Sequence, residues 1–442
     1  MRIHILVLAL FPLLAAHAAE RPNIVYIISD DHDYEHLGFM GNAFVKTPTL
    51  DSLAGNGTIF TTAHLPMSRC HPTLASFLSG RNPHQSGIYY NFGSARLNPE
   101  SSLPSLLQAA GYATYCEGKF WEGDPRAMGF THGAGKTAKS FVRKGQSDLF
   151  KFIDENSGNK PMMIWWAPLL PHTPHNPPQK YLDAYDWQKM PMPDYMKGAG
   201  KETIQSWKKK ERLSYAMEAW LDDGLAQLVK KLKAKDEFGS TLFVFVIDNG
   251  WCNGLPSKGS PFEKGVRTPV FFSWPGKIKS NQRLDNLIST NDIYPTILDY
   301  LDIPVPNSAA GKSLMPAIFG DAKYPFREIL FGASYPAFAT RDDERPARDI
   351  YALYARSDKW KYIYYLQDVR QVRNSKYFRI QSICTDYPER EAGEEDLFAI
   401  DNDPYELKDL ANKEVHAELK TRLKAQVLSW WTRTGGEPLT LK

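Results

Sequence analysis

Beyond its first eighteen residues, the chain lacks a long hydrophobic run, a charge excess and a dense set of cysteines. No later segment approaches the roughly 20 apolar residues that a membrane-spanning helix needs, which excludes an integral membrane protein. Lysine and arginine number 53 against 50 acidic residues, so the clear basic excess of a nucleic-acid-binding protein is missing as well. There is no internal repeat. What remains is an ordinary globular composition, 43% hydrophobic, over 442 residues.

Four cysteines are too few for a disulfide scaffold: Cys70, Cys116, Cys252 and Cys384. Cys70 stands at the start of a predicted helix, a position expected of a functional thiol. If Cys70 stays unpaired, the other three cysteines allow one bridge at most, and their spacing does not decide which two form it.

The segment Met1–Ala18 has the pattern of a cleaved signal peptide. Arg2 gives it a positive start, Ile3–Ala16 is almost wholly apolar, and Ala16 and Ala18 are the small residues that precede a cleavage site. The apolar stretch is shorter than the roughly 20 residues of an anchor. We therefore expect an exported protein, periplasmic or secreted, without stable membrane association.

Continuous apolar runs alternate with amphipathic helical patterns through most of the chain. The runs that we predict as buried strands are Asn23–Ser29, Gly111–Lys119, Pro161–Leu170 and Thr241–Asp248. The helical patterns include Thr47–Gly57 and Leu213–Ala234. This alternation is typical of an α/β fold, in which helices cover both faces of a mostly parallel central sheet.

The pattern changes near residue 335. The segments Asp358–Asp368 and Glu394–Pro404 indicate antiparallel strands and turns, Glu414–Arg433 indicates an amphipathic helix, and Arg341–Asp349 indicates a solvated charged loop. We therefore expect a signal peptide at 1–18, a large domain at 19–335, and a smaller C-terminal α+β subdomain with a short antiparallel sheet at 336–442.

Acidic and amide side chains directly follow two of the predicted strands. Asp30 and Asp31 follow the first, Asp248 ends the fourth, and Asn249 follows it. Ligands of parallel sheets bind beyond the carboxyl ends of the strands, so these side chains are expected to meet. Oxygen ligands suit Ca²⁺ or Mg²⁺ better than zinc. The alternative is that each aspartate caps the element that follows it. Because both pairs stand at the ends of apolar strands, a metal site is favoured.

The stretch CHPTLASFLSG predicts a helix that begins at Cys70. Pro72 stands near the first helical position, where proline is favoured. Cys70 is then at the positive end of the helix dipole, which favours a thiolate or another negatively charged sulfur or oxygen species. The alternative is a small buried hydrophobic residue.

Several blocks of the sequence, in the right order, resemble the sulfatases of the alkaline phosphatase superfamily. The resemblance runs from about Arg21 to Trp431. The blocks that carry it are RPNIVYIISDDH, TPTLDSLAGNGTIFT, CHPT with SGRNPHQSGI, GYATYCEGK, PHTPH, DNG, KGSPFEKGVRTPVFFSWPG, NDIYPTILDYL and LFAIDNDPYELKDLA. It implies an alkaline phosphatase-like fold, with residues 19–335 as the catalytic domain, and a sulfuric ester hydrolase activity.

The resemblance also implies roles for single residues. Cys70 corresponds to the cysteine that a formylglycine-generating enzyme oxidises, and whose hydrated aldehyde is both nucleophile and metal ligand. The other ligands of one calcium ion, preferred here to magnesium, are Asp30, Asp31, Asp248 and Asn249. The groups that hold the sulfate and assist the leaving oxygen are Lys119, His172 and Lys258.

These residue types suit the cleavage of an S–O bond. Cations around the sulfate stabilise the negative charge that gathers on its oxygens, and a divalent metal polarises the sulfate and activates the attacking hydroxyl. A histidine near the bridging oxygen can protonate the departing alcohol. His172 and His175 compete for this role, and we prefer His172 because the family's histidine directly follows the proline.

Two positions depart from the family's pattern. In the maturation motif Cys-x-Pro-Ser/Thr-Arg, Leu74 replaces the arginine that supports the formylglycine and is read by the maturing enzyme. Trp121 stands where the family usually has a histidine, two residues after the active-site lysine. The nearby cations that could supply part of the lost charge are His71, Arg69 and Arg81.

Three interpretations therefore stay open. The chain is a sulfatase whose Cys70 is oxidised despite Leu74, a phosphate mono- or diester hydrolase with an unmodified cysteine, or a sulfatase-like binding protein without turnover. The complete metal set and both lysines favour an enzyme, because burying that many charges without a ligand is costly.

Sulfated carbohydrates are the expected substrates, since exported sulfatases most often meet sulfated glycans. Trp121 is expected at the pocket edge, where an indole can face a sugar, although a buried role fits its surroundings equally well. His71 and His175 are further candidates for contact with the substrate.

Overall fold

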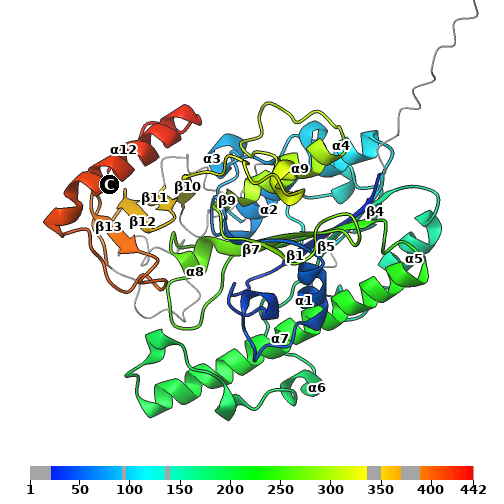
Figure 1. The fold of residues 1–442 in the computed structure, drawn as a ribbon, viewed down its shortest axis with the longest axis horizontal. Helices are drawn as coiled ribbons and strands as arrows, with labels where there is room; N and C mark the ends of the chain where they lie inside the picture. Colours follow the sequence, from blue (N-terminus) through cyan, green and yellow to red (C-terminus); the bar gives the residue numbers. More distant parts are fainter. Residues whose placement is uncertain (1–20, 92–95, 135–139, 336–349, 370–388, 442) are drawn as a thin grey trace, which may run out of the picture.

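The computed structural model describes residues 21–91, 96–134, 140–335, 350–369 and 389–441. The predicted signal peptide, the predicted loop at Arg341–Asp349 and Cys384 lie outside these residues. A large sheet and a small antiparallel sheet lie next to each other (Figure 1).

The large sheet has nine strands. Their order across the sheet is β4 (His132–Ala134), β3 (Ala113–Gly118), β5 (Met162–Ala167), β1 (Asn23–Ser29), β6 (Thr241–Ile247), β7 (Arg267–Ser273), β2 (Gly57–His64) and β8 (Gln282–Leu284), and β9 (Ile288–Ser289) also pairs with β2. Only β7 among these strands runs antiparallel to its neighbours, β6 and β2. This mostly parallel sheet confirms the predicted α/β fold class.

Helices cover both faces of the large sheet, because successive side chains of a strand point to opposite sides. Ile24, Tyr26 and Ile28 of β1 enter one apolar core, and Val25 and Ile27 enter the other. The helices of the first core are α2 (Cys70–Ser79), α4 (Leu103–Ala109), α9 (Ile293–Tyr300) and α10 (Met315–Ile318). Those of the second are α1 (Pro48–Gly55), α5 (Ser147–Asn156) and α7 (Lys201–Ala234).

Short helices fill the connections between these elements. They are α3 (Pro83–Ser86), α6 (Gln179–Leu182) and α8 (Glu263–Val266), with 3₁₀ turns at Gly38–Met40, Pro99–Ser101, Pro125–Met128, Trp187–Lys189, Asp194–Met196, Thr290–Asp292 and Glu414–His416.

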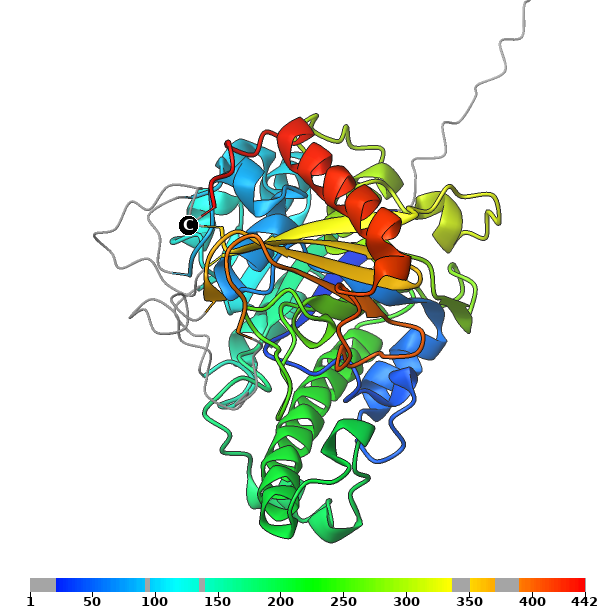
Figure 2. The same ribbon diagram turned by 90° about the vertical axis from the view of Figure 1, so that its left-hand side faces the viewer.

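The small sheet is antiparallel throughout and consists of β10 (Ile329–Ser334), β11 (Ala352–Ser357), β12 (Trp360–Tyr365) and β13 (Glu395–Ala399). Helix α12 (Ala417–Arg433) crosses one face (Figure 2) and packs Val427 and Trp431 into one core with Tyr362. On the other face, Tyr354 packs with Val266 of α8, which joins this sheet to the rest of the molecule. The first strand, β10, precedes the predicted domain boundary at residue 335.

The predicted strands match β1, β3, β5 and β6 closely, whereas α7 begins at Lys201, well before the predicted start at Leu213. The added segment has no apolar stripe, but it is rich in lysine and also contains glutamate and arginine, which favour helix. In the described part of the chain, every helix is too short or too polar to span a lipid bilayer.

Candidate active site

The predicted site residues gather at the carboxyl ends of four neighbouring strands. β1 pairs in parallel with β6 along its whole length, so Asp30 and Asp248 leave the sheet side by side. β3 and β5 lie on the other side of β1 and bring Lys119 and the segment Pro171–His175 to the same edge. The backbone N–H of Asp30 donates to the carbonyl oxygen of Leu170 at 3.0 Å, which links the residue after β1 to the segment after β5.

Two lysines pair with the buried carboxylates. Lys119 Nζ lies 2.5 Å from Asp30 Oδ1 and 2.6 Å from Asp248 Oδ2. Lys258, from the loop between β6 and α8, places its Nζ 2.5 Å from Asp31 Oδ1. Three carboxylates therefore face two ammonium groups, which leaves a formal excess of one negative charge. The side chains of Lys119 and Lys258 are 4% and 11% exposed, so this charge is poorly screened by water.

Asn249 and Cys70 complete the cluster. Asn249 Nδ2 donates to Asp31 Oδ1 at 2.5 Å, and the Cys70 thiol donates to Asn249 Oδ1 at 3.5 Å. Cys70 Sγ and carboxylate oxygens of Asp30 and Asp248 all lie within 4.8 Å of one another. The structure thus brings together all five residues predicted as metal ligands.

Two backbone features shape these loops. Asp31 has a φ of 55°, a left-handed conformation that aspartate tolerates better than most residues. At Gly250, which directly follows the Asp248–Asn249 pair, a Cβ would collide with the carbonyl oxygen of Lys264. The DNG block therefore needs its glycine, because the loop after β6 passes directly over the backbone of α8.

The charges of the cluster shift its pKa values strongly. Burial alone would raise the pKa of Asp31, but Lys258 and His172 outweigh it and hold this pKa well below its ordinary value. Burial raises the pKa of Asp248 to about 6, although Lys119 opposes this shift. Burial also raises the pKa of the Cys70 thiol, against the attraction of both lysines. The thiolate that the helix dipole favours is therefore disfavoured by burial.

The cluster fits a divalent cation. The Oδ2 atoms of Asp30 and Asp31 are buried and make no hydrogen bond to any described residue, which is costly unless another positive group is present. The donors are carboxylate and amide oxygens, the ligands that calcium and magnesium prefer. The excess negative charge points to the same kind of ligand.

His172 reaches the cluster, whereas His175 contacts an aromatic neighbour. His172 Nε2 lies 3.4 Å from Asp31 Oδ2, and its Nδ1 lies 2.7 Å from the carbonyl oxygen of Thr173. The ring of His175 meets the ring of Trp251 edge-on at 5.8 Å. His172 is thus the histidine of this segment whose ring lies beside a predicted metal ligand.

Arg143, which the sequence did not single out, holds the segment that carries His172. Its Nη2 donates to the carbonyl oxygens of Leu169 at 3.0 Å and His172 at 3.2 Å, and its Nη1 donates to Asn176 Oδ1 at 2.7 Å. These contacts lie on both sides of the histidine. No local pattern marks Arg143, because its partners belong to a later part of the chain.

The two departures from the family's pattern lie in apolar or already paired surroundings. Leu74 is 1% exposed and packs in the core beneath α2. His71 Nε2 lies 2.8 Å from Glu122 Oε1, and its Nδ1 lies 3.1 Å from the carbonyl oxygen of Tyr90. Trp121, half-buried, stacks on the His71 ring at 5.8 Å. The substrate contacts expected of His71 and Trp121 therefore compete with contacts inside the protein.

The cations that could replace the lost arginine differ in position. Arg81 donates to the carbonyl oxygen of Gln85. The guanidinium of Arg69 lies against Gly259, next to Lys258, where any side chain at position 259 would collide with it. Arg69 thus neighbours a residue of the cluster, whereas His71 and Arg81 are engaged elsewhere.

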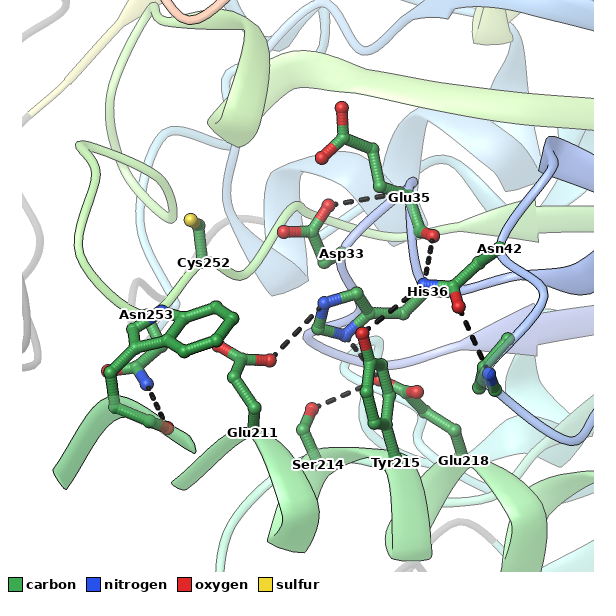
Figure 3. Close-up of polar contacts among 12 residues, drawn as sticks. Asp33, Glu35, His36, Asn42, Glu211, Ser214, Tyr215, Glu218, Cys252 and Asn253 are labelled. Atoms are coloured by element: carbon green, nitrogen blue, oxygen red, sulfur yellow. Dashed lines mark hydrogen bonds and ion pairs between the residues drawn. The ribbon is translucent and has the colours of Figure 1, made fainter. Parts of the chain in front are cut away.

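A buried network of charged residues holds the loop after β1 against α7 (Figure 3). His36 lies between two glutamates of α7, with 3.3 Å from Nε2 to Glu211 Oε2 and 3.0 Å from Nδ1 to Glu218 Oε1. Burial lowers the pKa of His36, but the two glutamates overcome it and raise it to about 10. Lys264 Nζ binds both carboxylate oxygens of Asp33, at 2.8 and 2.9 Å. This network, whose only sequence signal is the dense run DDHDYEH, anchors the loop that begins with the metal-ligand candidates.

Comparisons with known proteins agree with this geometry. Residues 22–303 match the family described as Sulfatase, and residues 253–376 match that described as N-sulphoglucosamine sulphohydrolase, C-terminal. An arylsulfatase of Clostridium perfringens is 25% identical over 90% of this chain and 92% of its own length. An N-acetylglucosamine-6-O-sulfatase of Bacteroides thetaiotaomicron is 22% identical over 69% of this chain and 72% of its own length. A protein solved with its substrate D-glucosamine-2-N,6-O-disulfate has a similar fold, with a TM-score of 0.75 and 18% identity over 94% of this chain and 98% of that one.

Proposed function

Because the chain belongs to the sulfatase family and is a sulfuric ester hydrolase, we propose that it removes sulfate groups from sulfated carbohydrates. The relative named N-acetylglucosamine-6-O-sulfatase supports a sugar substrate. The observation that carries the proposal is the meeting of oxygen ligands, two lysines and Cys70 at one edge of the sheet. We also propose that the enzyme is exported, on the signal-peptide pattern of Met1–Ala18.

The metal in this proposal is one calcium ion, held by the oxygens of Asp30, Asp31, Asp248 and Asn249 and by an oxygen on residue 70. Calcium is preferred to magnesium because it accepts a larger and less regular set of oxygen ligands. When bound, the ion polarises the sulfate group and favours the deprotonated nucleophile.

The nucleophile in this proposal is the hydrated aldehyde of a formylglycine made from Cys70 by a formylglycine-generating enzyme. The residue occupies the first position of α2 and touches Asn249, so an oxygen in place of Sγ would lie among the metal ligands. Leu74 lies one turn further along α2 and offers no hydrogen-bond donor, so the oxidation has to proceed without the family's arginine.

The remaining groups act on the sulfate and the leaving alcohol. Lys119 and Lys258 supply positive charge in a buried site, where it stabilises developing negative charge most effectively. The Nδ1 of His172 faces a carbonyl oxygen, which only accepts hydrogen bonds, so Nδ1 carries a proton. When the ring is doubly protonated, Nε2 carries the second proton and delivers it to the departing oxygen, and Arg143 keeps the histidine in place.

Mass spectrometry of the tryptic peptide Cys70–Arg81 tests the proposal most directly. We expect the mass of the aldehyde, together with hydrolysis of aryl sulfate that exceeds hydrolysis of aryl phosphate. A free thiol with phosphate ester hydrolysis would instead favour the phosphate hydrolase, and calcium binding without turnover would favour a binding protein. The family match and the relatives described above support neither alternative.

A further inference from the structure

A cavity of about 510 Å³ lies between the large and the small sheet, and none of its lining residues belongs to the candidate active site. Thr61 and Thr62 of β2, Arg267 of β7 and Arg283 of β8 line it from the large sheet. Arg356 of β11 lines it from the small sheet. We call it the arginine cavity, after Arg267, Arg283 and Arg356.

Arg356 is the most unusual residue of the arginine cavity. It is 4% exposed, and its Nε and Nη1 are buried without a hydrogen-bond partner among the described residues. Among the described residues, its Nε forms an ion pair with Glu263 Oε1 at 3.3 Å. The same oxygen also faces Lys361 Nζ at 3.0 Å and His64 Nε2 at 2.9 Å, so Glu263 is shared among three groups. Arg356 thus places at the cavity wall a positive charge that the shared Glu263 only partly neutralises.

Arg267 and Arg283 also use only some of their N–H donors on described residues. Arg267 uses Nε and Nη2 on the carbonyl oxygen of Thr61, both at 3.2 Å. Arg283 uses Nη1 on the carbonyl oxygen of Phe39 at 2.9 Å. A guanidinium has five N–H donors, so each of these arginines can bind a further acceptor.

The acidic residues of the arginine cavity limit the charge that it can accept. Asp285 and Asp358 lie at its exposed rim, and Asp285 Oδ1 accepts a hydrogen bond from Thr61 Oγ1 at 2.5 Å. Three arginines against two aspartates leave one net positive charge. This balance suits an oxyanion with a single charge, as in a sulfate monoester, better than a doubly charged phosphate monoester. The rim carboxylates can accept hydrogen bonds from hydroxyl groups.

We propose that the arginine cavity binds a sulfated sugar unit, with the sulfate on the three arginines and the sugar hydroxyls toward Asp285 and Asp358. Guanidinium groups bind such oxyanions through short charge-assisted hydrogen bonds. The volume lies within the range of about 300–1,000 Å³ typical of small-molecule sites. The choice of a sugar as the carrier of the sulfate rests on the proposed function.

Isothermal titration of glucosamine 6-sulfate into the full-length Cys70→Ala variant, which cannot turn it over, tests this proposal. We expect two binding sites, one of which weakens about tenfold or more in Cys70→Ala/Arg283→Gln, because the variant loses the charge-assisted hydrogen bonds of Arg283 to the sulfate. Arg356→Lys keeps the positive charge beside Glu263 but removes the planar guanidinium that can bind two oxygens at once, so it should weaken the same site. Arg422→Gln, on the exposed face of α12, is the matched control and should leave both sites unchanged.

Further ligands separate the sources of the anion. Inorganic sulfate should bind the arginine cavity more weakly than the sulfated sugar, and unsulfated glucosamine and glucosamine 6-phosphate should not compete for it. Unchanged two-site binding in both arginine variants, with melting temperatures like the parent's, would overturn the proposal, and so would equal affinity for inorganic sulfate. Failure of the proposed function would appear separately, as intact glycan sulfate after incubation with the wild-type enzyme.

Discussion

The two sides of Cys70 differ in chemistry. On the side of the strand ends, charges meet directly: Lys119 lies 2.5 Å from Asp30, and Lys258 lies 2.5 Å from Asp31. On the side of α2, Leu74 packs in the core and His71 pairs with Glu122 beneath Trp121. We call the first the charged side and the second the packed side.

This difference shows where the family's pattern is kept and where it is replaced. The charged side retains the complete set of carboxylates and lysines, and it still has buried carboxylate oxygens without a hydrogen bond to any described residue, which fits a bound cation. The packed side lacks the arginine and the histidine of the family. Leu74 stands in place of the arginine and packs in the core, and Trp121 stands in place of the histidine and stacks on His71. Chemistry should therefore depend on the charged side, and stability on both.

Cys70→Ala should produce the largest effect, because it removes the precursor of the nucleophile at the boundary of the two sides. We expect aryl sulfate turnover to fall by at least about 10³-fold, as for other enzymes that lose a nucleophile. Cys116→Ala, at a buried cysteine in the core of the sheet, is the control and should retain turnover. Equal activity of wild type and Cys70→Ala would remove Cys70 from the mechanism.

Calcium removal should affect the charged side alone. Dialysis against a chelator should lower turnover by about a hundredfold or more, since a metal supplies several kcal/mol of charge stabilisation. Added calcium at 100 times its Kd should restore turnover and add about 2.7 kcal/mol to the free energy of unfolding. If neither the melting temperature nor the rate of turnover changes on dialysis against the chelator or on addition of calcium, the metal assignment is contradicted.

Lys119→Met should lower both the stability and the turnover of the enzyme by removing a central cation of the charged side. It leaves Asp30 and Asp248 buried without their common partner, which costs about 3–5 kcal/mol of stability in comparable buried pairs. Turnover should fall by about 10²–10³-fold, the usual effect of removing a group that stabilises transition-state charge. Urea unfolding and kcat measure the two effects. Lys189→Met, which removes an exposed ion pair with Asp186, should cost no more than about 1 kcal/mol and no activity.

Leu74→Ala tests the packed side. The side chain is fully buried, so its truncation should cost about 2–5 kcal/mol of unfolding free energy. If the packed side acts through packing, the kcat of the folded enzyme, measured well below its melting temperature, should change less than tenfold. The exposed Leu407→Ala is the control and should change stability by about 0.5 kcal/mol at most. A large loss of kcat without a loss of stability would show that Leu74 acts on the chemistry.

Trp121→Ala should give the smallest effect and reveal whether the packed side also faces substrate. We expect glycan turnover to fall several-fold, while turnover of a small aryl sulfate stays near the wild-type value, because the sugar of a glycan extends to the pocket edge where the indole is expected and a small aryl ester does not. Both kcat/KM values and the melting temperature should be measured. Equal losses on the two substrates would assign Trp121 to packing on His71 alone.

Much of the fold and part of the site could be predicted from short stretches of sequence. The apolar runs located β1, β3, β5 and β6 because a buried strand needs apolar side chains on both faces. Asp30, Asp31, Asp248 and Asn249 followed as strand-end residues. The start of α7 was missed because its first three turns carry no apolar stripe.

Other parts of the site left no local signal. Arg143 contacts Leu169, His172 and Asn176, which belong to a different loop, so no spacing along the chain could identify it. The pairing of His71 with Glu122 was equally hidden, and it turned a candidate substrate ligand toward the protein interior.

Local sequence was enough to locate β1, β3, β5 and β6 and the polar residues at their ends, because an apolar run and the residues that follow it are neighbours in the chain. Which charges meet depends on how distant segments fold together: Lys258 reaches Asp31 across 227 positions, and three arginines from β7, β8 and β11 reach one cavity. Electrostatic contacts act over a few ångströms in space, whatever the distance along the chain.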